Sequence, residues 1–190
     1  MEFPWMMFGL SLLIPLVGVW LWMIGRRRQS QQEPPCAIVL LLRAARVIDA
    51  RLLAELLTQE TGRPISARQI DANLIPRGDE PANDTVIGVA PHFIAVIGGT
   101  YFMVHNPERP YGGEVGVEHE AWLSMEILHP QAVSRANYQI VGRVLSHMVG
   151  EACLALYHPP HRTCVPYTAK TAEFLRAEDP IKALFDAAHS

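Results

Sequence analysis

A long uncharged segment near the N-terminus restricts what this chain can be more than any other feature. No residue from Phe3 to Gly25 carries a charge, and as an α-helix this segment would be about 34 Å long. The hydrocarbon core of a bilayer is about 30 Å thick, so the segment is long enough to span it with a slight tilt. We therefore expect residues 1–25 to be a transmembrane anchor, in contact with the lipid bilayer through residues 3–25.

The residues that flank this segment predict its orientation. Tryptophans stand near both ends, where amphipathic indole rings favour the interface between lipid and water. Three consecutive arginines follow the segment and no basic residue precedes it, so the positive-inside rule places the N-terminus outside and the remainder in the cytoplasm. A cleaved signal peptide would need a basic N-terminal region and a small-residue cleavage site, and neither is present. The predicted membrane-interface residues are Trp5, Trp20, Trp22, Arg26, Arg27 and Arg28.

Behind the anchor, the composition predicts a linker and one domain. Residues 26–35 are basic and polar, rich in Gln and closed by two prolines, which is typical of a short linker. Residues 36–190 are enough for one domain. The chain has a net charge of −3. Residues 1–28 hold three arginines against one glutamate, so the rest is mildly acidic and does not favour nucleic acid. Three cysteines are too few, and odd in number, for a disulfide framework.

The hydrophobic periodicity of the domain predicts alternating strands and helices. A helix over 50–61 is indicated by a leucine stripe between Asp49, a good N-cap, and Gly62, a good C-terminal stop. Pro130 is expected to open a second amphipathic helix that ends near Gly150, and two short helical pieces follow near 169–177 and 180–188. The predicted strands are 36–42, 65–74, 85–90, 92–97, 100–105, 120–128 and 152–157, with a Gly-Gly hairpin turn at 98–99.

This order of elements predicts an α+β domain. We expect one mixed, largely antiparallel sheet with two main helices on one face, because that arrangement buries the apolar side of every element economically. A ferredoxin-like split βαβ core with an inserted hairpin fits the order best.

Four stretches carry a resemblance to a known family. The segments HEAWLSMEILHP, YQIVGRVLSHMVGE, CLALYHP and DPIKALF resemble a bacterial α+β domain family of unknown function, over about residues 36–187. The resemblance implies a small bacterial domain, and with it a bacterial inner membrane for the anchor. It implies no activity.

One loop holds the densest set of metal-type ligands. His158, His161 and Cys164 follow the strand 152–157, and imidazole and thiolate groups suit Zn²⁺, which usually takes four ligands. His129, at the end of an earlier strand, is the candidate for the fourth. A structural zinc motif usually needs a second ligand cluster, and none is present, so a polar loop stiffened by proline is the simpler interpretation. No other cofactor is indicated.

A second loop, Asn106 to Gly116, is a candidate for binding. It combines charged, aromatic and flexible residues, as loops that serve in recognition do, although an ordinary long connection would look the same. The candidate binding residues are Glu108, Arg109, Tyr111 and His119.

The sequence leaves three functional hypotheses. It lacks a nucleophile elbow, a P-loop and a dinucleotide fingerprint, so we favour a membrane-tethered binding or regulatory module with a partner at the membrane. The first alternative is a membrane-anchored metal-dependent hydrolase that uses His158, His161 and Cys164. The second is a membrane-associated scaffold or oligomerising protein.

Overall fold

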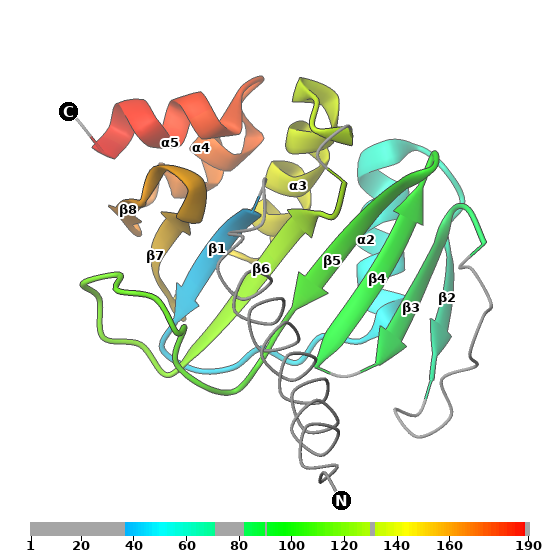
Figure 1. The fold of residues 1–190 in the computed structure, drawn as a ribbon, viewed down its shortest axis with the longest axis horizontal. Coiled ribbons are helices and arrows are strands. Elements are labelled where there is room, and N and C mark those ends of the chain that lie inside the picture. Colours follow the sequence, from blue (N-terminus) through cyan, green and yellow to red (C-terminus); the bar gives the residue numbers. More distant parts are fainter. Residues whose placement is uncertain (1–36, 71–81, 90, 130–131, 189–190) are drawn as a thin grey trace, which may run out of the picture. The chain divides into compact units, whose positions relative to one another are not determined.

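A computed structural model describes residues 37–70, 82–89, 91–129 and 132–188 (Figure 1), all of which belong to one compact unit, Pro34–Ser190. The strands are β1 (Ala37–Leu42), β2 (Ser66–Gln69), β3 (Thr85–Val89), β4 (His92–Ile97), β5 (Thr100–His105), β6 (Ala121–Ile127), β7 (Cys153–His158) and β8 (Thr163–Pro166). The helices are α2 (Ala50–Thr61), α3 (Arg135–Met148), α4 (Thr171–Arg176) and α5 (Pro180–Ala188), with a short 3₁₀ helix at Pro159–His161.

The strands form one mixed sheet in the order β2-β3-β4-β5-β6-β1-β7-β8. The first strand of the domain lies inside the sheet and pairs antiparallel with both β6 and β7. These two strands therefore run parallel to each other, with α3 as the crossover between them. All other neighbours are antiparallel except β2 and β3, which are parallel.

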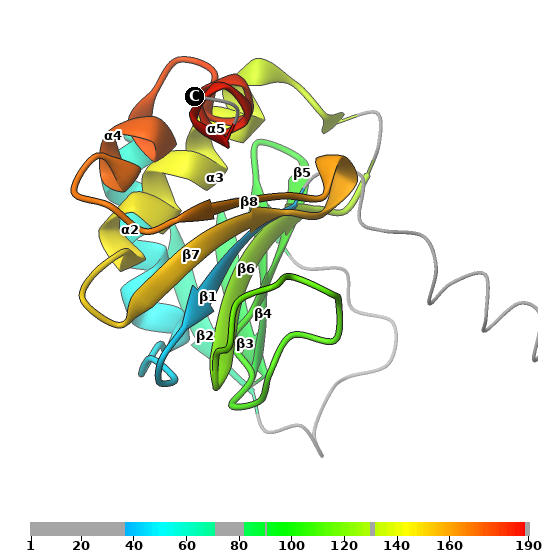
Figure 2. The same ribbon diagram turned by 90° about the vertical axis from the view of Figure 1, so that its left-hand side faces the viewer.

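The helices cover one face of the sheet (Figure 2). We call this the helix face; its side chains include Leu40, Phe102 and Leu123, which belong to the main core. Because successive residues of a strand point to opposite sides, the residues between them, such as Val39 and Trp122, lie on the other face. We call it the loop face, since the segment 106–120 passes over part of it (Figure 2).

The first helix and the hairpin confirm the predictions made from the sequence. In α2 the Asp49 side chain accepts a hydrogen bond from the Leu52 amide at 2.7 Å, and Gly62 ends the helix at φ = 68°. The strands β4 and β5 pair across Gly98 and Gly99, which both have positive φ, as a tight hairpin turn requires. In β6, which lies within the predicted strand 120–128, alternate residues from Ala121 to Ile127 are buried, as expected for a strand with one side in the core.

Helix α3 begins later than predicted. Its first residue is Arg135, because the Ser134 hydroxyl accepts from the Asn137 amide at 3.2 Å and so caps the helix there. Near its middle, α3 packs so closely on α4 and the first residue of α5 that Gly142 leaves no room for a side chain. A Cβ at this position would lie 2.2 Å from the Leu175 carbonyl oxygen.

Two strands differ from the predictions in length or existence. Strand β2 begins within the predicted segment 65–74 and ends at Gln69, and residues 71–81 lie outside the description. Strand β8 was not predicted; it folds back on β7 after the 3₁₀ turn, where Arg162 adopts φ = 50°. Because this segment contains proline, arginine and threonine, its sequence does not show the apolar pattern from which a strand is predicted.

The predicted transmembrane anchor and linker, residues 1–35, lie outside the described residues. Within the ranges that the structure does describe, none of the helices has the length and apolar character that crossing a bilayer requires.

Candidate functional site

A second, smaller core lies on the loop face. Its fully buried members come from β1 and β7, and the segment 106–120 adds apolar side chains. The ring of Tyr111 stands edge-on to that of Trp122, with ring centres 5.2 Å apart, and also contacts Tyr157. The predicted binding loop is therefore packed against the sheet. The cluster comprises Val39, Leu41, Tyr111, Val115, Val117, Trp122, Ala155, Tyr157 and Cys164.

His119 fixes the shape of this loop. Its Nε2 accepts a hydrogen bond from the Tyr111 amide at 2.7 Å, and its Nδ1 donates to the Val117 carbonyl at 2.7 Å. Both ring nitrogens are therefore occupied within the loop itself. Of the predicted binding residues, His119 has a structural role, whereas Glu108 and Arg109 are exposed.

Three titratable side chains from neighbouring strands form a hydrogen-bonded chain on the loop face. His92 of β4 lies opposite His105 of β5, and their Nδ1 atoms are 2.8 Å apart. The Nε2 atom of His105 is 2.5 Å from a carboxylate oxygen of Glu126 in β6. The Glu126 side chain is 12% exposed and that of His105 is 23% exposed, whereas His92 is open to solvent. The chain thus runs from a nearly buried carboxylate to an accessible imidazole.

Electrostatics keep the accessible end of this chain neutral. The pKa of His92 is lowered from its ordinary value, first by partial burial, then by the adjacent His105 and by the positive charge of Arg109. The predicted loop residue Arg109 therefore acts on a histidine that the sequence analysis did not select. Arg109 and His92 therefore bring a cation and an imidazole that favours its neutral form to the same end of the sheet.

Two polar atoms near this chain are buried without a partner. The indole Nε1 of Trp122, whose ring centre is 5.8 Å from that of His105, has no hydrogen-bond partner among the described residues, and neither has Oδ1 of Asn106, which follows β5 directly. An unpaired buried polar atom costs about 1–3 kcal/mol, and native proteins keep few of them.

The sequence analysis missed His92, His105 and Glu126. A two-residue turn at Gly98 and Gly99 implies that His92 and His105 lie opposite each other, so the sequence alone could have predicted this pair. Its third member was not, because Glu126 joins through the register of β5 with β6, where it lies opposite Met103.

The structure does not bring the four predicted metal ligands together. His158 and His161 lie on the helix side with ring centres 4.7 Å apart. Cys164 belongs to the cluster on the loop face. His129 packs on Tyr101. Because the next residue of the strand, Phe102, lies in the core on the helix face, Tyr101 points to the loop face. The sheet therefore separates His158 from Cys164. Among the described residues, no group of three His, Cys, Asp or Glu side chains is arranged to hold a metal ion.

His158 is buried in an unusual state. It is 3% exposed, and neither ring nitrogen has a hydrogen-bond partner among the described residues. Burial, and to a lesser extent the neighbouring His161, lowers the pKa of His158 to about 4. His161 in turn contacts Phe185 of α5, with ring centres 5.8 Å apart. The imidazole is therefore neutral beneath a helix that covers this end of the sheet.

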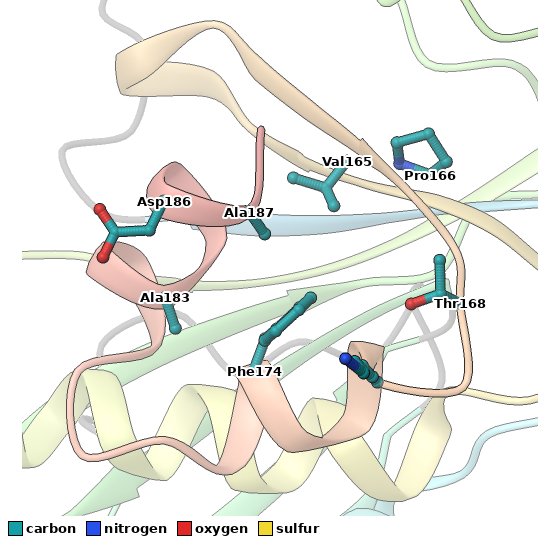
Figure 3. Close-up of a pocket in the computed structure, with 8 residues that line it drawn as sticks. Val165, Pro166, Thr168, Phe174, Ala183, Asp186 and Ala187 are labelled. Atoms are coloured by element: carbon teal, nitrogen blue, oxygen red, sulfur yellow. The ribbon is translucent and has the colours of Figure 1, made fainter. Parts of the chain in front are cut away.

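A separate cavity lies between β8 and the two C-terminal helices (Figure 3). Its volume is about 580 Å³, within the usual range of sites for small molecules. Its walls are mainly apolar: Val165, Phe174, Ala183 and Ala187 line it, and the Asp186 carboxylate stands to one side (Figure 3). It contains none of the residues predicted as a site.

In comparisons with known proteins, no family model matches the chain, and neither does a curated protein or a solved structure. The resemblance seen in the sequence therefore stays a prediction, and function has to be inferred from the residues themselves.

Proposed function

We propose that this chain is a membrane-tethered binding or regulatory module, whose recognition surface is the loop face of the sheet. The observation that carries the proposal is the hydrogen-bonded chain from Glu126 through His105 to His92, which ends beside Arg109. Half-buried titratable groups are costly to desolvate and add little to a core. Clusters of titratable groups in which a pKa is shifted, as that of His92 is lowered, are typical of functional sites.

The tether in this proposal is the segment 3–25, with the N-terminus outside and the domain in the cytoplasm of a bacterial cell. A short linker would keep the domain close to the bilayer, and confinement there raises the effective concentration of a partner at the membrane. Weak recognition by a small polar site is then sufficient for function.

A ferredoxin-like core supports a recognition role for the sheet. We infer that β5, β6, β1 and β7, with the crossover helices α2 and α3, form this split βαβ unit, and that β2 to β4 extend it at one edge. The strand order supports the inference. A fold of this kind hosts many functions, so the proposal depends on the side chains of the loop face and not on the fold.

The other two hypotheses have less in their favour. The metal-dependent hydrolase would need His158, His161 and Cys164 around one ion, and the first and last lie on opposite faces of the sheet. Within the described ranges, no particular contact favours the scaffold.

Site-specific photo-crosslinking in native membranes tests the proposal. A photoreactive amino acid replaces Glu108 on the loop face in the full-length chain, and Glu55 on α2 in a matched control; both side chains are exposed. We expect the chain to stay in the membrane pellet after alkaline extraction, and a discrete adduct from position 108 that H92A abolishes. Release by alkali would contradict the tether, and equal adducts from both positions would contradict the recognition surface.

A further inference from the structure

The cavity between β8, α4 and α5 is polar at its sides and apolar in its middle. Asp186 stands on one side and Thr168 on the opposite side, and the apolar side chains of Val165, Phe174 and Ala187 lie between them (Figure 3). Its volume of about 580 Å³ is that of a site for a small molecule. A ligand that fills this cavity therefore needs a mainly apolar body, with polar atoms only at its ends.

Small side chains on α5 contribute to the open space. Ala183 and Ala187 are about one helical turn apart, and both line the cavity. The neighbouring Leu184 is buried in the main core instead. Helix α5 thus packs on the domain through one side and turns two alanines to the cavity. A leucine in place of Ala187 would occupy part of this space, so the cavity can be closed by a single substitution.

One side of the cavity carries a positive charge that is left for a ligand. Lys170 lines the cavity and belongs to the same turn as Thr168, whose amide donates to the Thr171 hydroxyl at 2.8 Å. Among the described residues, the ammonium group of Lys170 forms no ion pair or hydrogen bond. The Asp186 carboxylate differs, because the Lys182 ammonium donates to it at 2.6 Å. A ligand with an anionic end is therefore favoured, and that end belongs beside Lys170.

The size and walls of the cavity restrict the occupant further. A stable protein interface takes about 20–30 residues from each side, whereas eight residues line this cavity, so a small molecule fits better than a protein partner. A molecule with polar atoms along its length would bury them against alanine, valine and phenylalanine without partners, which is costly. An unbranched alkyl chain with one anionic head group suits both the walls and the charged side.

On these grounds we propose that the cavity binds a fatty acid, with its alkyl chain along Val165, Phe174 and Ala187 and its carboxylate paired with the ammonium group of Lys170. The site is separate from the loop face, because Val165 packs with the main core on the helix face. Failure of the proposed recognition surface would therefore leave this site unaffected, and failure of this site would leave the recognition surface unaffected.

Photo-labelling of the full-length chain in phosphatidylcholine nanodiscs tests the proposal. The probe is decanoic acid with a diazirine in its alkyl chain, and peptide mapping by mass spectrometry locates the adduct, which we expect within residues 165–187. Unlabelled carboxylates should compete, and their affinity, referred to the free aqueous concentration, should rise about threefold for each methylene from hexanoate to decanoate. Decyltrimethylammonium, which has the same chain length and the opposite charge, should compete less well than decanoate.

Three results of this experiment would overturn the proposal. They are an adduct outside the cavity, competition that does not depend on chain length, and equal competition by the cationic and anionic compounds.

Substitutions test the walls and the charge separately. A187L should fill part of the cavity and strongly reduce the adduct, whereas A188L makes the same change at an exposed position of α5 and should keep it. K170Q should weaken competition by decanoate about threefold, as the loss of one exposed ion pair does, and should leave competition by uncharged decanol unchanged. The control R51Q removes a positive charge from the exposed side of α2 and should change neither.

Circular dichroism must show the wild-type fold for each variant that is compared. Equal adducts in A187L and A188L would overturn the assigned cavity, and equal effects of K170Q on decanoate and decanol would overturn the assigned head group. If A187L does not fold, K170Q and the series of chain lengths still decide the question.

Discussion

Replacement of His158 by phenylalanine should change how the stability of the domain depends on pH. The folded state lowers the pKa of His158 to about 4, whereas the ordinary value in an unfolded chain is about 6.5. The folded protein therefore binds this proton less tightly than the unfolded one. The buried imidazole therefore has no effect through protonation above about pH 6.5, and it destabilises the fold progressively as the pH falls toward 4.

The size of the effect follows from these two values. Between pH 7 and pH 5 the linkage relation gives a loss of about 2 kcal/mol in the free energy of unfolding that H158F does not share. At pH 7 the variant should be at least as stable as wild type, because replacing a buried group whose nitrogens have no partners by an apolar one of similar shape removes a desolvation penalty.

Urea unfolding of the full-length chain in mild detergent, followed by circular dichroism at both pH values, measures this difference. H129F, which removes an exposed histidine, should keep the pH dependence of the wild type. All other titrating groups are shared by the proteins compared, so they cancel in the difference. If H158F and wild type lose stability in parallel between pH 7 and pH 5, the reasoning about this buried imidazole is refuted.

Substitutions at two positions, followed by the same unfolding measurement, and one thiol-labelling experiment test the account of the fold further. G142A should lose about 2–4 kcal/mol, because its Cβ would lie 2.2 Å from the Leu175 carbonyl oxygen, whereas G112A has open space around it and should be nearly neutral; equal effects would contradict the close packing. D49A should lose about 1 kcal/mol with the cap of α2, and D49N should keep most of it; a loss as large in D49N would contradict the capping role. Burial raises the pKa of the Cys153 thiol to about 11, so an alkylating reagent should modify it only as fast as the domain unfolds, and mass spectrometry that finds rapid labelling in the native protein would show that it is accessible.

Local signals made part of this fold predictable. The helix 50–61 carries its own N-cap and C-terminal glycine, and the hairpin carries its glycine pair, so each boundary is encoded within a few residues. The alternation in β6 likewise separated Trp122 and Glu126 from the core side. These features depend on sequence neighbours alone, and the structure confirms them.

Features that depend on distant partners were beyond the sequence. Strand β8 has little strand character of its own and exists through pairing with β7. Three of the four predicted zinc ligands are close in sequence, yet the alternation of β8 turns Cys164 to the face opposite His158. The chain from His92 to Glu126 needs three strands in register, and strand register between β5 and β6 is set after a loop whose length does not determine it.

Nitrogen-15 NMR of the histidine rings in the full-length chain tests the central claim most directly, because it reports which ring nitrogen carries the proton. The account predicts that E126Q changes the ring-nitrogen resonances of both His105 and His92, because the three side chains form one hydrogen-bonded chain. E120Q, at an exposed position outside the chain, should change neither. Resonances of His92 that stay unchanged in E126Q would contradict the chain on which the proposed recognition surface rests.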